Sequence, residues 1–256
     1  MIKRISSPEN LNFKRWLKAI QARGVKKSGI TFLSGPKQVG EVLKDFRHFC
    51  TGIILSTHHD IPAGLDDSEM AVYQLEADLF REIDRYGTGH PVLIIRVDPL
   101  PLWDEREWPR GCTLFIPFQD PVNVGSVIRS AAAFGVPRVV MLEEAAHPFH
   151  HKSARVAGSA LFRVPILKGP SIERVGGISV PLITLSPSGE SIAQYSFPDT
   201  FGLLPGLEGP GLPKNMRDRP ALGIPMTHGV ESLNASQATG IVLYLWRHGL
   251  RGQAEK

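Results

Sequence analysis

Short apolar runs alternate with amphipathic segments along the first hundred residues. Three apolar runs have the length of strands: ITFLS (30–34), GIILS (52–56) and PVLIIRV (91–97). Three further segments have the apolar spacing of helices: LNFKRWLKAIQAR (11–23, with Leu11, Trp16, Leu17 and Ile20), PKQVGEVLKDF (36–46) and LEADLFREIDRY (75–86). Because strand-like and helix-like segments alternate, this region predicts a small α/β unit.

The periodicity then breaks at residues 98–111, DPLPLWDEREWPRG, which contain three prolines and many charged side chains. Proline and the lack of a regular apolar spacing are typical of a connection rather than of a helix or strand. We therefore expect two domains: residues 1–106, with a linker to about 111, and residues 107–256.

The second half again alternates strand and helix patterns. Strands are expected at CTLFIPF (112–118), RVVML (138–142), FRVPIL (162–167), ISVPLITL (178–185), TFGLLP (200–205) and ALGIPM (221–226). Helices are expected at residues 123–135, with an apolar stripe of Val124, Val127, Ile128 and Ala131, and from about Ser232 to His248, with Ala238, Ile241, Val242 and Leu245 on the core face. Strand–helix–strand alternation implies a parallel sheet, so the expected fold class is α/β.

Charge is distributed unevenly along the 256 residues. Residues 1–50 hold 11 Lys and Arg against 3 Asp and Glu, whereas the remainder holds 18 against 22. A basic first module suits a polyanion such as RNA, because Lys and Arg displace counterions from phosphates, although a merely solvated basic surface has the same composition.

Composition excludes several other classes. Cys50 and Cys112 are too few for a disulfide framework or a Cys-rich metal site, which favours a reduced, cytoplasmic setting. No segment approaches the roughly 18 uninterrupted apolar residues of a membrane span, and the basic N-terminus has no apolar run of signal-peptide length.

The first candidate for chemistry is QDPVNVGSVIRS, at the start of the 123–135 helix. Asn123 is placed to cap this helix, which is the structural explanation for it. Arg129 projects about 150° away from the apolar stripe of the helix, so it is either a solvated arginine or a guanidinium aimed at phosphate or ribose.

Two more polar or glycine-rich stretches follow strand ends, where open α/β sheets bind ligands. LLPGLEGPGLP (203–213) has three glycines in six positions, which permits close backbone approach, and includes Glu208. IPMTHGVESLNASQATG (224–240) places Ser232 and Asn234 at a helix start, where such residues cap and where free N–H groups attract a ligand carboxylate.

Together, the three stretches resemble the ordered motifs of the SpoU/TrmH-type RNA ribose 2′-O-methyltransferases of the SPOUT superfamily. NVGSVIRSAAAFGV, LLPGLEGPGL and IPMTHGVESLNAS resemble motifs one, two and three, and HKSARVAGSALFRVP resembles the segment between motifs one and two. FKRWLKAIQARGVKKSGITFLSGPKQVGEVL resembles the small ribosomal-protein-like RNA-binding domain that often precedes them.

The resemblance implies a parallel-sheet SPOUT domain with a deep trefoil knot, a homodimer, S-adenosylmethionine as cofactor, and RNA as substrate, with ribosomal RNA favoured over transfer RNA. The catalytic positions that match are Asn123, Arg129, Glu208, Ser232 and Asn234. The cofactor-binding positions that match are Leu204, Gly206, Leu207, Glu208, Ile224, Met226, Ser232, Leu233 and Asn234.

The chain departs from the family pattern at three positions. Family members usually have glycine where His228 stands, a small polar residue where Leu207 stands, and a glutamate where Ser34 stands. The first two bear on the shape of the cofactor pocket, and the third bears on RNA recognition.

Three other readings are weighed against this one. HPFHH (147–151) brings three histidines together, but without Cys, Asp or Glu at matching spacing we expect no metal. A nicotinamide oxidoreductase is disfavoured because the glycines follow Gly-x-x-Gly-x-Gly spacing and no acidic residue lies about 20 positions on. A non-catalytic RNA-binding protein of the same fold remains the serious alternative.

Overall fold

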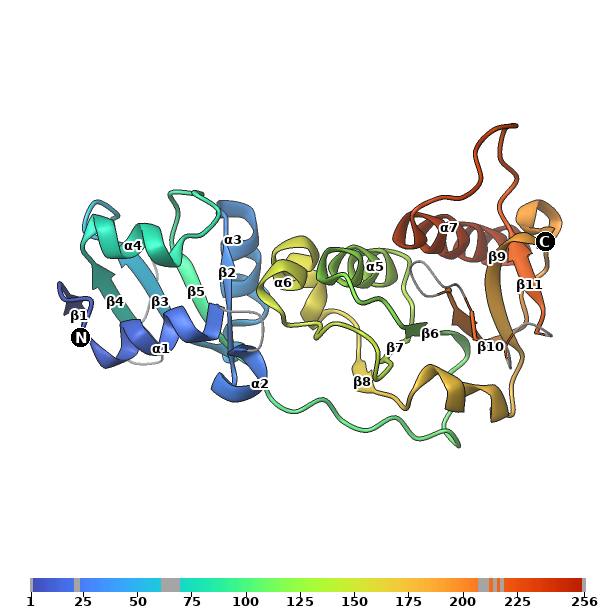
Figure 1. Cartoon of the computed structure of the whole chain (residues 1–256), viewed down its shortest axis with the longest axis horizontal. Coiled ribbons are helices and arrows are strands. Elements are labelled where there is room, and N and C mark those ends of the chain that lie inside the picture. The colour runs from blue at the N-terminus through green and yellow to red at the C-terminus, as the bar shows by residue number, and fades with distance from the viewer. Residues whose placement is uncertain are drawn as a thin grey trace. The chain divides into compact units, whose positions relative to one another are not determined.

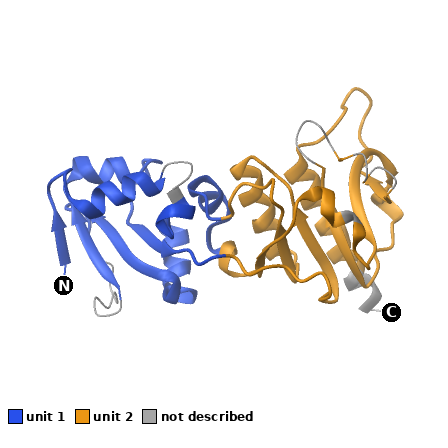
Figure 2. Ribbon diagram, turned by 60° about the horizontal axis from the view of Figure 1, so that its bottom comes forward, with its two compact units in different colours: residues 1–99, 149–159 blue, residues 100–148, 160–256 orange. Residues whose placement is uncertain are grey.

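Two α/β units make up the chain in the computed structural model (Figure 1), which describes residues 2–20, 24–60, 70–206, 212–213, 216 and 219–254. One compact unit comprises residues 1–99 with 149–159, and the other comprises residues 100–148 with 160–256 (Figure 2). The contacts thus divide the chain at residue 99 and assign one later segment to the first unit. The domain boundary expected at residue 107 stays a prediction.

The first unit has a five-stranded sheet in the order β1-β4-β3-β5-β2. Its strands are β1 (Ile2–Ile5), β2 (Ile30–Ser34), β3 (Cys50–Ser56), β4 (Ala71–Leu75) and β5 (Val92–Arg96). β4 pairs in parallel with β1 and β3, whereas β5 runs antiparallel to both β3 and β2. The three strands that the pattern predicts are confirmed, to within two residues at each end.

The pattern missed β1 and β4. Three of the four residues of β1 are exposed, including Lys3 and Arg4, because it is an edge strand paired only to β4. In β4, Val72 and Leu75 are buried while the residues between them are half-buried, so the strict alternation of a half-exposed strand is absent.

Helices cover both faces of this sheet. They are α1 (Leu11–Ile20), α2 (Gly24–Ser28), α3 (Pro36–Asp45), α4 (Ala77–Ile83) and α6 (His151–Ala157). Phe13 and Trp16 of α1 pack with Phe80 of α4 in one cluster over the sheet. Leu11 is 85% exposed, because it is the first residue of its helix and precedes the apolar face.

The second unit has a six-stranded sheet in the order β11-β9-β10-β6-β7-β8, and every strand pair in it is parallel. Its strands are β6 (Gly111–Ile116), β7 (Arg138–Met141), β8 (Ile166–Lys168), β9 (Leu182–Ser191), β10 (Thr200–Leu204) and β11 (Ala221–Gly223). The predicted parallel α/β sheet is confirmed.

Helices α5 (Pro121–Ala133) and α7 (Ala235–Ala254) pack against each other beside this sheet (Figure 1). The predicted apolar stripe of α5 is confirmed, since all four of its side chains are fully buried. The prediction for α7 is wrong at Ile241, which is 38% exposed, because the core face runs instead through Thr239, Val242 and Trp246. Thr239 is buried because its hydroxyl donates to Ala235 O at 2.7 Å, which a purely apolar pattern does not reveal.

The segment expected to be a linker is irregular and more than half of its residues are exposed, but its two tryptophans are packed. Leu102 forms an isolated bridge to Lys168, and the rings of Trp103 and Trp108 lie against the cluster that contains Phe115. Alternate strand residues face opposite sides of a sheet, so this cluster covers the face that α5 and α7 leave open. Among the residues described, no helix is both long enough and apolar enough for a membrane crossing.

Candidate active site

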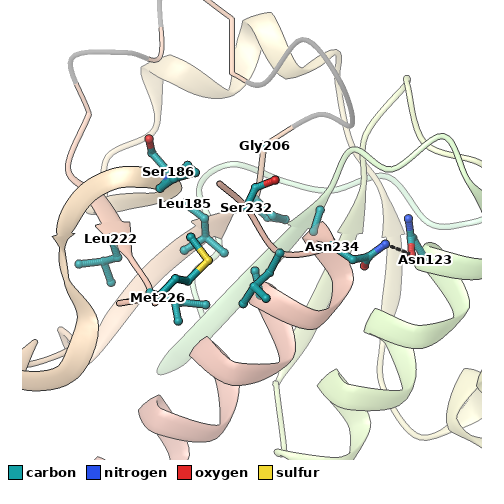
Figure 3. A pocket seen from close by; sticks show the side chains of 14 residues that line it. Asn123, Leu185, Ser186, Gly206, Leu222, Met226, Ser232 and Asn234 are labelled. Atoms are coloured by element: carbon teal, nitrogen blue, oxygen red, sulfur yellow. Dashed lines mark hydrogen bonds between the residues drawn. The ribbon is translucent and has the colours of Figure 1, made fainter. Parts of the chain in front are cut away.

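A pocket of about 480 Å³ lies at the carboxyl ends of strands in the second unit (Figure 3). Its walls come from five places along the chain: Asn123; Leu185–Pro187; Pro205 and Gly206; Leu222, Ile224 and Met226; and Ser232–Ala235 with Ala238. A pocket of this volume with mostly apolar walls and a few polar groups is typical of a small-molecule site.

Parallel pairing is what brings these segments together. All strands of the sheet point the same way, so the turns that follow β6, β10 and β11 emerge at one edge. Pro205 and Gly206 directly follow β10, and Ile224 directly follows β11. Described residues of the three stretches therefore meet at this edge and line the pocket, while their binding of a ligand stays a prediction.

Asn123 links the first turns of α5 and α7. Its Oδ1 accepts hydrogen bonds from Asn234 Nδ2 at 3.2 Å (Figure 3) and from Ser236 Oγ at 3.1 Å. Asn123 and Ser236 are both buried, at 8% and 5% exposure. Because buried amides are costly without partners, this arrangement fixes the Asn123 side chain at the pocket wall.

The helix caps differ in part from the expectation. The cap of α5 is Asp120, whose side chain accepts from Val122 N at 2.9 Å, so the expected capping role of Asn123 is wrong. Asn234 does cap α7, because its Oδ1 accepts from Ser236 N at 2.9 Å and from Gln237 N at 3.3 Å. These two N–H groups therefore already have a hydrogen-bond acceptor. Fewer free backbone donors remain at the start of α7 for a ligand carboxylate than the sequence suggested.

Most of the predicted site residues meet in this one pocket. Those that line it are Asn123, Gly206, Ile224, Met226, Ser232, Leu233 and Asn234. Leu204 precedes the pocket wall and is fully buried without lining it. Leu207 and Glu208 fall outside the described residues, so their predicted roles stay predictions.

Arg129 is not among the residues that line the pocket. It is exposed on α5, six residues beyond Asn123, which places it about 9 Å along the helix and on another face. Val122 is seven residues before it, so Val122 and Arg129 share one exposed face of α5.

Sequence reasoning missed the wall formed by Leu185, Ser186 and Pro187. These residues lie within β9: Leu185 is the last residue of the apolar run that predicted the strand, and Ser186 and Pro187 follow it. The available signal was the small polar stretch SPSGES directly after that run, which has the composition of a turn.

None of the histidines at 147–151 is among the residues that line this pocket. Burial and the positive charges of His150, Arg85 and Lys152 together lower the pKa of His151 to about 4. Burial and Lys152 likewise lower the pKa of His150. Within the described parts of the chain, no group of three His, Cys, Asp or Glu side chains has the arrangement of a metal site.

Comparisons with known proteins show which family this chain belongs to. A family model described as the SpoU rRNA Methylase family matches residues 114–244. The Ribosomal RNA small subunit methyltransferase G 2 of Syntrophobacter fumaroxidans is 43% identical over 95% of this chain, but the chain spans only 49% of that relative. The 23S rRNA (guanosine(2553)-2'-O)-methyltransferase RlmP of Bacillus subtilis is 27% identical over 95% of this chain and 98% of the relative.

A solved structure has the same fold. The crystal structure of an AdoMet-bound rRNA methyltransferase from Sinorhizobium meliloti matches with a TM-score of 0.78 at 21% identity, covering 97% of this chain and 98% of that one. The likeness extends over both α/β units, so it concerns the whole described architecture.

Proposed function

Because the chain belongs to the SpoU rRNA Methylase family, we propose that it transfers a methyl group from S-adenosylmethionine to a ribose 2′-hydroxyl of RNA, with ribosomal RNA favoured over transfer RNA. The observation that carries the proposal is the pocket in which described residues of all three motifs meet. The RlmP relative, matched over nearly its full length, is named as a 2'-O-methyltransferase of 23S rRNA, which supports both the reaction and the RNA class.

The residues of the pocket fit this cofactor. Leu222, Ile224, Met226 and Leu233 offer apolar surface for a flat heterocycle, while the backbone at Gly206 is open to close approach because glycine has no side chain. We propose that these residues, with Leu204 supporting the wall from behind and Leu207 and Glu208 as predicted, hold S-adenosylmethionine.

When bound, S-adenosylmethionine supplies an electrophilic methyl group on a sulfonium. The chain has to hold the ribose 2′-oxygen in line with that methyl group and assist the loss of its proton. Asn123, Ser232 and Asn234 present amide and hydroxyl groups at the pocket, where they can hydrogen-bond to ribose, and we assign Glu208 to the same set by its motif position.

Arg129 is proposed to act through its charge. A guanidinium has a pKa above about 12 and scarcely deprotonates in proteins, which argues against a role as general base. Its planar fork can instead bind the RNA phosphate beside the target, orient the 2′-hydroxyl and favour the ionised oxygen electrostatically.

A homodimer through α5 and α7 is part of the proposal. Val122, Ile241 and Tyr244 are apolar side chains that are 43%, 38% and 52% exposed on these two helices. Exposed apolar side chains on two packed helices are typical of an association surface, and Arg129 lies on the same face of α5 as Val122. The dimer is supported if scattering gives twice the monomer mass and Tyr244→Glu halves it.

Three further assignments complete the proposal. We propose the deep trefoil knot from the family membership together with the strand order, in which β11 returns beside β9 and not beside β10.

We assign RNA binding to the first unit because its exposed α2 lysines, Lys26 and Lys27, belong to the basic N-terminal region. We propose a cytoplasmic location because ribosomal RNA is the proposed substrate.

The test is a methyl-transfer assay with labelled S-adenosylmethionine and unmodified ribosomal RNA, transfer RNA and ribosomal particles in separate reactions. We expect label in a 2′-O-methylnucleoside of ribosomal RNA, identified by mass spectrometry after digestion. Label in transfer RNA alone would overturn the choice of RNA class. No transfer to any pool, with no cofactor binding by calorimetry, would favour the non-catalytic RNA-binding alternative.

A further inference from the structure

We propose that Trp103 and Trp108 are positioning residues that hold the Pro205–Gly206 wall of the cofactor pocket, although neither tryptophan lines that pocket. They belong to residues 100–108, which we call the tryptophan segment. The proposal rests on the proposed function, since it concerns the same pocket, and it adds a role for a segment that the sequence marks only as a linker.

The tryptophan segment is fixed to the second unit by backbone hydrogen bonds. Trp103 N donates to Lys168 O at 2.9 Å, and Lys168 N donates to Pro101 O at 2.8 Å. This pair extends the edge of the sheet at β8, so the segment follows the protein surface at a defined register. A flexible connection would not have such a register.

The two indole rings then pack against the sheet. The Trp103 ring lies edge-on to Phe115 of β6 with 5.2 Å between ring centroids, and edge-on to Trp108 at 5.8 Å. The centroid of Trp108 is 6.2 Å from that of Phe115. Edge-to-face aromatic packing at these distances is favourable beyond the area that it buries.

The same hydrophobic cluster holds both described ends of the second motif. Leu204, the last residue of β10, and Met216 are both fully buried in the cluster, and Leu212 packs against it. Pro205 and Gly206, which line the pocket, directly follow Leu204. The tryptophans therefore support the residues from which this pocket wall extends.

This influence is exerted through packing: β10 ends at Leu204, so no pairing among the described strands fixes Pro205 and Gly206. Protein interiors are close-packed, and removal of a large side chain lets its neighbours shift into the space. A shift of Leu204 or Met216 would move the adjoining wall without any change in a residue that touches the cofactor.

The Trp103 indole nitrogen supplies a second, independent indication. Trp103 Nε1 is buried and has no hydrogen-bond partner within the described structure, whereas Trp108 Nε1 donates to Glu105 O at 2.8 Å. An unpaired buried donor costs stability, so the contribution of Trp103 lies in the shape and size of its ring. Trp103→Phe, which keeps an aromatic ring and removes the unpaired donor, is therefore a suitable conservative control.

The experiment compares the full-length variants Trp103→Ala, Trp108→Ala, Trp103→Phe and Trp246→Ala. Trp246→Ala is the matched control: Trp246 packs on Phe201 at 6.0 Å, near the amino end of β10, and lies about 12 Å along α7 from the pocket residue Ala238. Calorimetry measures the Kd of S-adenosylmethionine, steady-state kinetics measure KM and kcat, and circular dichroism establishes that each variant is folded.

We expect both alanine variants of the tryptophan segment to bind S-adenosylmethionine about 3- to 30-fold more weakly, with KM raised and kcat at saturation changed less than about twofold. Trp103→Phe and Trp246→Ala should stay within about twofold of wild type. Wild-type affinity in folded Trp103→Ala and Trp108→Ala, or an equal loss in Trp246→Ala, would overturn the inference.

A cofactor-independent readout separates this inference from the proposed function. Hydrogen exchange at the amides of Leu204 and Gly206 should accelerate in Trp103→Ala and Trp108→Ala but not in Trp246→Ala. If wild type fails to bind S-adenosylmethionine while these amides respond, the proposed function is wrong and the support by the tryptophans stands. If the amides do not respond, the inference fails. Should either alanine variant not fold, Met216→Ala, which truncates the cluster from the other side, takes its place.

Discussion

The two units start from the same alternation of strands and helices, yet they present different surfaces. In the first unit, β5 runs antiparallel to its neighbours β3 and β2, so strand ends of both kinds occur at each edge of the sheet. In the second unit, all pairs are parallel and the carboxyl ends converge on the 480 Å³ pocket. Strand direction, more than composition, therefore decides where a ligand site can be assembled.

The starts of α3 in the first unit and α5 in the second unit also differ in whether they form part of a ligand site. Both α3 and α5 begin with proline at the first turn, after Gly35 and Asp120 respectively. Gly35 has a φ of 101° and provides no side-chain cap, whereas Asp120 caps α5 and leaves Asn123 to bind α7. A helix that begins with proline thus follows a plain turn in the first unit, whereas in the second unit its first turn contributes to a polar site.

The largest effect on activity is expected from a change of Arg129, which lies on α5 of the second unit. Arg129→Ala should lower the single-turnover rate of methyl transfer by about 100- to 1,000-fold, because a charge that stabilises the transition state is lost. The side chain is exposed, so the unfolding midpoint should stay near that of wild type. Arg129→Lys distinguishes charge from geometry: full activity in that variant would count against a required bidentate fork.

Asn123→Ala should have the next largest effect. It removes the acceptor for Asn234 Nδ2 and Ser236 Oγ, so we expect a loss of about 1–3 kcal/mol in the free energy of unfolding and cofactor binding weakened about 5- to 100-fold. Denaturant titration and calorimetry measure the two quantities. Ser130→Ala is the control, since its hydroxyl donates to Ser126 O within α5. Equal effects of both changes would contradict a special role for Asn123.

The division of labour between the units is tested at Lys26 and Lys27, which are exposed on α2. The double change to alanine should weaken RNA binding on the order of tenfold at low salt and reduce the slope of log K against log salt concentration by about 1 to 2. Filter binding over a salt series measures this. Cofactor affinity should be unchanged, and a loss there would mean that the units are not functionally separate.

A pH effect is expected at His151 in the first unit. The pKa of His151 is lowered to about 4, below its unfolded value of about 6.5, so the unfolded chain binds more protons between these values. The stabilisation is complete above about pH 6.5 and is lost as pH falls towards about 4. Thermal unfolding across this range should show the decline, and His151→Phe should flatten it. An unchanged pH profile in that variant would refute the assignment.

The smallest effect is expected at His228, where the family usually has glycine. His228 is exposed and does not line the pocket, so His228→Gly should change the Kd of S-adenosylmethionine by less than about twofold. Calorimetry on both proteins decides this. A large loss of cofactor binding would show that the departure from the family pattern has reshaped the pocket.

Local pattern was sufficient wherever a segment is buried on one simple face. Strands β6, β7 and β10 and the stripe of α5 were predicted because their burial follows apolar spacing directly. The predictions for 162–167 and 178–185 overlap β8 and β9 only in part. Local pattern failed at β1, whose residues are mostly exposed, and at α7, where Thr239 is buried by a hydrogen bond and Ile241 is exposed. A hydrogen bond within a helix and a position at the edge of a sheet both change which residues are buried, and neither can be read from local hydrophobicity.

The candidate site likewise contains residues that the sequence predicts and contacts that it does not. Ser232 and Asn234 could be found from their motif, but the partner of Asn234 is Asn123, 111 residues earlier in the chain, and only the fold reveals it. The packing of Trp103 and Trp108 on Phe115 was likewise hidden, because three prolines and many charges gave their segment the composition of a linker. Long-range contacts of this kind depend on topology, which periodicity does not encode.

The strand order also determines which parts of the second sheet can form first during synthesis. β6, β7 and β8 are neighbours in space and are the first strands of their sheet to leave the ribosome, so this half of the sheet can form early. Apart from Asn123, the pocket is built from residues 185–238, which follow β8 by up to 70 positions. At about 5–20 residues per second, they emerge over roughly 4 to 14 seconds after β8. The nascent chain thus has half of the sheet well before it has a pocket, and a bound cofactor can stabilise the second unit only once residue 238 has emerged.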